Sequence, residues 1–191
     1  MIKLWYRGIL TAVATLILFV SQIGVSSAMA AGVTPFGPER FAENHATYVI
    51  TTHSKYYRNI WKSAIAAWNK TGAFHFEAGT KGSAQIDLTT ASKAQAASMG
   101  QDVGLTEYTA NRDLLTKVSA TLNPTLLAEY GYAKSDDLHV AEHELGHTMG
   151  LAHNPSKKSV MYYRNRSESI QKVDIEGVEL RYNTPAGQAA N

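Results

Sequence analysis

The stretch HELGHTMGLAH, residues 143–153, constrains this chain more than any other part of its sequence. Side chains four residues apart lie on one face of an α-helix, one turn from each other, so His143 and His147 can share a metal ion. Glu144 projects beside that pair, where it can reach a water molecule on the ion without binding the ion itself. This spacing predicts a helix that carries a metal site.

The end of the same stretch supplies a third histidine. Gly150 accepts the left-handed conformation and predicts a sharp reversal at the end of the helix. That reversal lets His153 come back toward the first two histidines, which it could not do on a continuing helix. A preference of histidine for helix C-termini would explain one histidine but not the whole arrangement.

Three histidines with one open position form the catalytic type of zinc site, whereas a fourth protein ligand closes a structural site. In the catalytic type, zinc lowers the pKa of a bound water molecule toward about 7 and polarises a carbonyl group. Glu144 would take the proton of that water and pass it to the departing amine. The stretch therefore predicts a hydrolase acting on peptide bonds.

The stretch resembles the long zinc signature of the metzincin metalloproteases, and SVMYY (159–163) follows at the distance of the Met-turn of that clan. Within the clan the chain looks most like the matrixins, the catalytic domains of matrix metalloproteinases. AIAAWNKTGAFHFEAG resembles their first helix and second strand, and DIEGVELRY resembles their closing helix. The resemblance covers residues 45–183 and implies a zinc endopeptidase with the three histidines on one ion and the glutamate as its base.

The resemblance also implies roles for residues outside the stretch. Met161 would form an apolar floor beneath the metal, with a plain core methionine as the alternative. Tyr163 stands where astacins and serralysins place a tyrosine near the metal, and packing beneath the cleft is its alternative role. The segment GLTEYT (104–109) would be the edge along which an extended peptide lies, or simply an edge strand protected by Glu107. No segment resembles the matrixin loop for a second zinc, and calcium binding stays open.

Hydrophobic periodicity predicts the elements of one α+β or α/β domain with one sheet. Spacings of three and four predict an amphipathic helix that starts at Ser54 and ends at Thr71-Gly72. Strands are predicted at 45–52, 74–78, 85–90, 104–109 and 117–123. Ser135 should cap the metal-site helix, and a last helix should begin near Asp174. A metzincin-like fold would arrange these strands as a twisted mixed sheet of about five strands, covered by the amphipathic, active-site and C-terminal helices.

Residues 1–30 have the order of a secretory signal: basic Lys3 and Arg7, an apolar stretch, and the small-residue site Ala28-Met29-Ala30. An uncleaved membrane anchor is the alternative, because the apolar stretch nearly reaches the roughly 17 residues that a spanning helix needs. The rest of the chain divides into a surface segment (31–44), the protease domain (45–183) and a polar tail (184–191).

The signal holds two of the chain's 18 basic residues and none of its 16 acidic ones, so the remainder is close to neutral. This balance does not favour a nucleic-acid partner. The absence of cysteine excludes zinc held by thiolates, and a domain without disulfides must be held together by burial of its core, which bound ions could supplement. We expect a secreted monomer that acts on protein or peptide substrates. A non-catalytic binding or adhesion module is the alternative, although such modules commonly lose the base that Glu144 supplies here.

Overall fold

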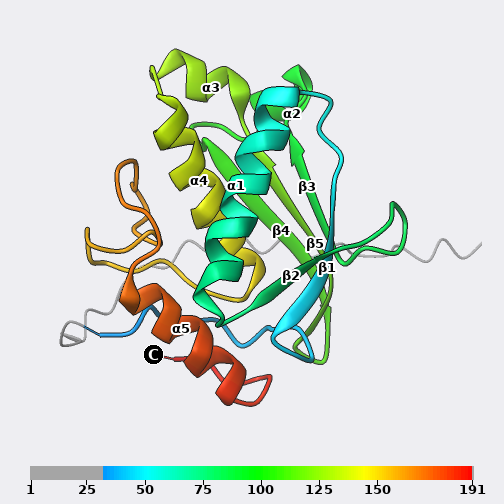
Figure 1. The fold of residues 1–191 in the computed structure, drawn as a ribbon, viewed down its shortest axis with the longest axis vertical. Coiled ribbons are helices and arrows are strands. Elements are labelled where there is room, and N and C mark those ends of the chain that lie inside the picture. Colours follow the sequence, from blue (N-terminus) through cyan, green and yellow to red (C-terminus); the bar gives the residue numbers. More distant parts are fainter. Residues whose placement is uncertain (1–31, 191) are drawn as a thin grey trace, which may run out of the picture. The chain divides into compact units, whose positions relative to one another are not determined.

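The computed structural model describes residues 32–190, so the predicted export signal lies outside the described residues. The described chain forms one five-stranded sheet in the order β2-β1-β3-β5-β4, with helices packed against it (Figure 1). The predicted α+β fold with a single mixed sheet is confirmed. No helix within residues 32–190 combines the length and apolar character needed to cross a membrane.

The elements follow one another as β1 (His45–Ile50), α1 (Lys55–Thr71), β2 (His75–Ala78), β3 (Ile86–Thr90), α2 (Lys93–Ser98), β4 (Gly104–Asn111), β5 (Leu114–Leu122), α3 (Pro124–Glu129), α4 (Lys134–Thr148) and α5 (Lys172–Asn183). Strands β2, β1, β3 and β5 pair in parallel, and β4 pairs antiparallel with β5. Arg112 and Asp113 connect β4 to β5 with positive φ angles of 48° and 62°, as a tight hairpin turn requires. Strand β4 is therefore an antiparallel edge strand.

Helix α1 forms where the amphipathic stripe predicts it. The Ser54 hydroxyl caps its start by accepting a bond from the Tyr57 amide, and Gly72 ends it with a φ of 77°. Its buried stripe includes Trp61 and Trp68, whose indole nitrogens donate to carbonyl oxygens of Thr89 on β3 and Glu142 on α4. These two bonds fix α1 against the sheet and beside α4, on the same face (Figure 1).

Helix α4 starts differently from the prediction. Ser135 does not cap it, because the helix begins one residue earlier at Lys134 with Ala133 at the cap position. The Asp136 carboxylate, three residues on, accepts a 3.0 Å hydrogen bond from the Ala133 amide instead. An acidic residue in the first turn thus accepts from the amide of the cap residue itself, whereas a serine cap would have accepted from an amide of the first turn.

Two short helices were not predicted from the sequence. Helix α2 begins with a capping box between Ser92 and Gln95. Helix α3 has Asn123 as its N-cap and Pro124 in its first turn, directly after the strand predicted at 117–123. Both helices have six residues, which is too short for an apolar stripe to show in the sequence.

The two ends of the described chain pack against the domain. Phe36 and Phe41 are buried ahead of β1, and Phe36 bridges to Leu151 and to Ala190. Arg181 of α5 is fully buried, and its guanidinium donates to the carbonyls of Gly37 and Gln188, among others. These contacts hold the ends close to the turn that follows α4.

Candidate metal centre

The structure brings the three predicted histidines together. The Nε2 atom of His147 lies 3.0 Å from that of His143 and 3.3 Å from that of His153. One nitrogen from each ring lies within 4.8 Å of the others, and no other group of three or more potential ligand side chains occurs among residues 32–190. The reversal after α4 makes this arrangement possible, because Gly150 has a φ of 96°.

The outer ring nitrogens determine which form of each imidazole is present. His143 Nδ1 lies 2.7 Å from the Val160 carbonyl, and His147 Nδ1 lies 2.8 Å from the Leu151 carbonyl. A carbonyl oxygen only accepts, so both Nδ1 atoms donate and both Nε2 atoms present a lone pair. Burial lowers the pKa of His143 to about 4 and holds the pKa of His147 well below its ordinary value, so both rings are neutral.

The donor set fits a zinc ion. Two neutral Nε2 lone pairs that face each other at 3.0 Å repel unless a cation lies between them. Three imidazole nitrogens that converge without a fourth ligand side chain from residues 32–190 match the donor set of a catalytic zinc site.

Glu144 lies next to the first histidine and is nearly buried. Its Oε2 atom accepts a 2.6 Å hydrogen bond from the Thr106 hydroxyl of the edge strand β4. Burial raises the pKa of Glu144 to about 7, while the bond from Thr106 acts to lower it. A carboxylate beside the metal position, with one oxygen already bonded, can serve as a proton acceptor.

Met161 lies fully buried beneath α4. A side chain on Gly146 would overlap the Met161 sulfur, so the absence of a Cβ at that position lets the methionine pack directly under the helix between His143 and His147. The turn that carries Met161 also supplies the Val160 carbonyl that orients His143. The turn thus supports the metal site from below.

A buried carboxylate that was not predicted as a site residue holds this turn. Asp174 of α5 accepts hydrogen bonds from the Ser159 hydroxyl at 2.5 Å and from the Val160 amide at 2.9 Å. It also accepts one from Thr34 in the N-terminal segment, at 2.6 Å. The only signal in the sequence was an acidic residue in the first turn of a helix, which ordinarily indicates a capping role.

Tyr163 lies near the metal position but outside the core. Its ring centroid is 6.5 Å from that of His153, and its side chain is 56% exposed. The Arg164 guanidinium lies 5.2 Å from the centre of the Tyr163 ring. This exposure does not fit the alternative that Tyr163 packs beneath the cleft.

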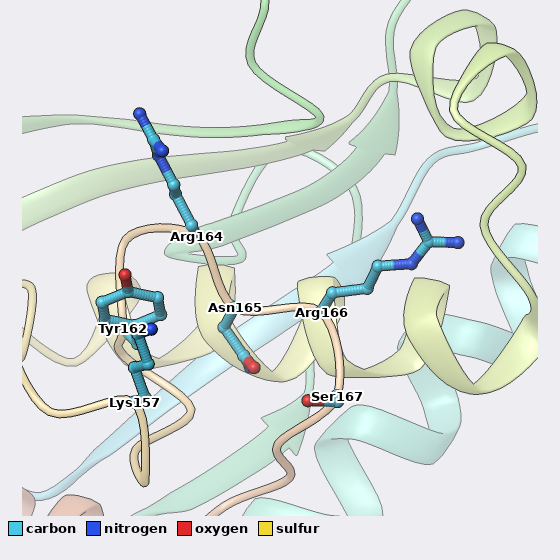
Figure 2. A pocket seen from close by; sticks show the side chains of 6 residues that line it. All are labelled: Lys157, Tyr162, Arg164, Asn165, Arg166 and Ser167. Carbon is cyan, nitrogen blue, oxygen red and sulfur yellow. The ribbon is translucent and has the colours of Figure 1, made fainter.

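A hollow of about 380 Å³ lies along the segment after the turn, lined by Lys157, Tyr162, Arg164, Asn165, Arg166 and Ser167. Figure 2 shows that Arg164 and Arg166 point in different directions from this segment. Arg166 pairs with Asp136 at 3.0 Å and lies over the Tyr132 ring. The basic side chains therefore do not converge on one anion, and Arg166 ties the segment to the start of α4.

Comparison with known proteins adds an independent finding. A family model described as matrixin matches residues 40–183, a span that contains the five strands and five helices of the described residues together with the histidine cluster. No curated protein matches the chain.

Proposed function

Because the chain belongs to the matrixin family of zinc-dependent peptidases, we propose that it is a secreted endopeptidase that cuts peptide bonds within protein substrates. The observation that carries this proposal is the convergence of three histidine nitrogens beside a buried glutamate. His143, His147 and His153 would hold one zinc ion. That ion would polarise the scissile carbonyl and lower the pKa of a water molecule.

Glu144 is the proposed base. Its Oε2 atom is bonded to Thr106, and its Oε1 atom accepts no hydrogen bond from the described residues. Oε1 can therefore take the proton of the attacking water and later deliver it to the departing amine. Gly150 would support the site through the reversal after α4 and Met161 through the apolar floor. Tyr163, whose exposed ring lies 6.5 Å from that of His153, would contact the substrate.

The edge strand β4 is the proposed docking site for the substrate backbone. Its outer side pairs with no other strand in the described chain, whereas its inner side pairs with β5 along its whole length. An extended peptide can pair with such an edge through main-chain hydrogen bonds, which supply affinity with little sequence preference.

The mechanism is tested by Glu144→Gln in the exported protein. We expect this change to reduce cleavage of unfolded casein by at least roughly 100-fold, since it removes the proton acceptor and keeps the shape of the side chain. Zinc content, measured by atomic spectroscopy, should stay at one ion per chain. Cleavage at the rate of the unchanged protein would exclude Glu144 as the base, whereas absence of cleavage by the unchanged, zinc-loaded protein would favour the non-catalytic module.

Secretion rests on the signal-like order of residues 1–30. Mass spectrometry of the protein recovered from the culture medium should give a chain that begins at Ala31. Recovery of the intact chain in the membrane fraction would instead identify a peptidase anchored through its uncleaved N-terminal segment.

A further inference from the structure

The catalytic glutamate packs against two positions of one strand. Gly104 and Thr106 are two residues apart on β4, so they face the same side of the sheet. That side faces α4, because the Thr106 hydroxyl reaches Glu144 and the Gly104 backbone lies against the same carboxylate. Within the sheet, β4 pairs with β5 on its inner side. The contacts with Glu144 come from the face of β4, so they leave the outer edge of β4 open for substrate.

The Thr106 hydroxyl is directed at the carboxylate. It lies 2.6 Å from Glu144 Oε2 and 3.2 Å from the Glu144 carbonyl oxygen, and its single proton favours the closer, charged acceptor. Threonine is branched at Cβ and stiff at χ1, so the strand backbone fixes where its hydroxyl points. A flexible polar side chain would not hold the carboxylate in one orientation in this way.

Gly104 provides the space that the carboxylate occupies. A Cβ built on this residue would overlap the Cγ, Cδ and Oε1 atoms of Glu144. Gly104 is not among the glycines with positive φ, so the reason for glycine here is space and not backbone conformation. Any larger residue would displace the base or push β4 away from α4.

We propose that Gly104 and Thr106 position the general base, with Thr106 holding Oε2 and Gly104 admitting the carboxylate, so that Oε1 stays free to accept the proton. This inference rests on the proposed peptidase function. Both are positioning residues, since neither touches the reacting atoms. The strand that would bind the substrate backbone thereby also sets the orientation of the base relative to that substrate.

Kinetics on the zinc-loaded, exported protein test the proposal with fluorescently labelled casein. Thr106→Val keeps the shape and removes the hydroxyl, so kcat should fall between about 10-fold and 100-fold while KM changes less than about twofold. Thr106→Ser restores a hydroxyl and should recover kcat to within about threefold of the unchanged protein. Gly104→Ala should lower kcat at least as much as Thr106→Val.

A matched control is available in the same sheet. The Thr51 hydroxyl donates to the Asp87 carboxylate, also at 2.6 Å, and neither residue belongs to the metal centre. Thr51→Val removes a bond of the same kind, so it should leave kcat unchanged. An equal fall of kcat in Thr51→Val and Thr106→Val would overturn the proposal, because it would show a general effect of weakening the sheet.

A second readout does not depend on activity. In zinc-free protein, adding Thr106→Val to the unchanged protein should lower the urea midpoint of unfolding by more than adding it to Glu144→Ala. The Glu144→Ala variant has already lost the contact between Thr106 and Glu144. Equal shifts in both backgrounds would overturn the proposed contact. If the unchanged protein does not cleave casein, the proposed function fails, while this double-mutant cycle still decides whether Thr106 holds Glu144.

Discussion

At the scale of single residues, the metal centre depends on atoms that never touch the metal. His143 and His147 are oriented by carbonyl groups of Val160 and Leu151, which belong to the turns after α4. Outer hydrogen bonds of this kind fix the ring orientation and the tautomer of a ligand. Residues that shape those turns are therefore expected to influence zinc affinity through the orientation of the histidines.

A substitution at Gly146 measures how strongly the metal site depends on the turn that carries Met161. In most helices, Gly→Ala stabilises by up to about 1 kcal/mol. Here the new methyl group would overlap the sulfur of the buried Met161, and such overpacking costs about 1–3 kcal/mol. We expect Gly146→Ala to lower the melting temperature and the zinc affinity.

The variant Met161→Ala supplies the control for this prediction. With the methionine side chain removed, the space under α4 is open, so adding Gly146→Ala should be neutral or stabilising. Calorimetry of the single and double variants measures the difference. A fall in melting temperature that is the same with and without Met161 would contradict the packing argument.

Sequence reasoning predicted the placement of residues inside one contiguous motif and missed residues that reach it from other elements. Helical geometry alone places His143, His147 and Glu144, and the glycine at position 150 predicts the reversal that returns His153. Thr106 and Asp174 have no such local signal. Their roles arise because β4 and α5 pack near α4. This packing joins Thr106 to Glu144, 38 positions away, and Asp174 to Ser159, 15 positions away.

At the scale of elements, α5 and the turn beneath the metal form one unit held by Asp174. Four donors converge on its carboxylate: the hydroxyls of Thr34 and Ser159 and the amides of Val160 and Gln171. An ionised carboxylate only accepts hydrogen bonds, so it can serve all four donors. A side-chain amide, which has an NH2 donor in place of one oxygen, cannot accept from all of them.

Asp174→Asn should therefore destabilise the protein although it preserves size. The amide nitrogen would face two donors and leave buried groups unpaired, at a cost of about 3 kcal/mol. Urea unfolding measures this cost, and zinc affinity should fall with it because the Val160 carbonyl loses its support. Asp87→Asn is the control and should cost clearly less, because among the described residues the Asp87 carboxylate accepts a hydrogen bond only from the Thr51 hydroxyl. Equal effects of both changes would show that Asp174 has no special role.

The elements themselves were predictable in proportion to their length. Helix α1 shows its stripe over 17 residues, so its ends were predicted within a residue. Helices α2 and α3 span six residues each and depend on N-terminal caps that the sequence analysis did not identify. The start of α4 was misplaced because two neighbouring residues, Ser135 and Asp136, can both serve a helix N-terminus and only the structure shows which does.

At the scale of the whole molecule, the regions that surround the metal come from distant parts of the chain. The Gly37 amide donates to the Gly150 carbonyl at 2.9 Å, which joins the N-terminal segment to the reversal after α4. The buried Arg181 bonds carbonyls of both ends of the described chain and lies over the Phe36 ring. The reversal is thus clamped by segments far from it in sequence.

This arrangement predicts that zinc stabilises the entire domain and not only its own ligands. Zinc bound to the folded state alone adds about 4 kcal/mol at a concentration about 1,000 times its dissociation constant. A chelator should therefore lower the melting temperature of the unchanged protein and of Glu144→Gln by the same amount, since the base is not a ligand. His153→Ala, which lacks one ligand, should show little further fall. The chelator could instead lower the melting temperature of His153→Ala as much as that of the unchanged protein. The stabilising ion would then bind outside the histidine cluster, and the assignment of zinc to that cluster would be wrong.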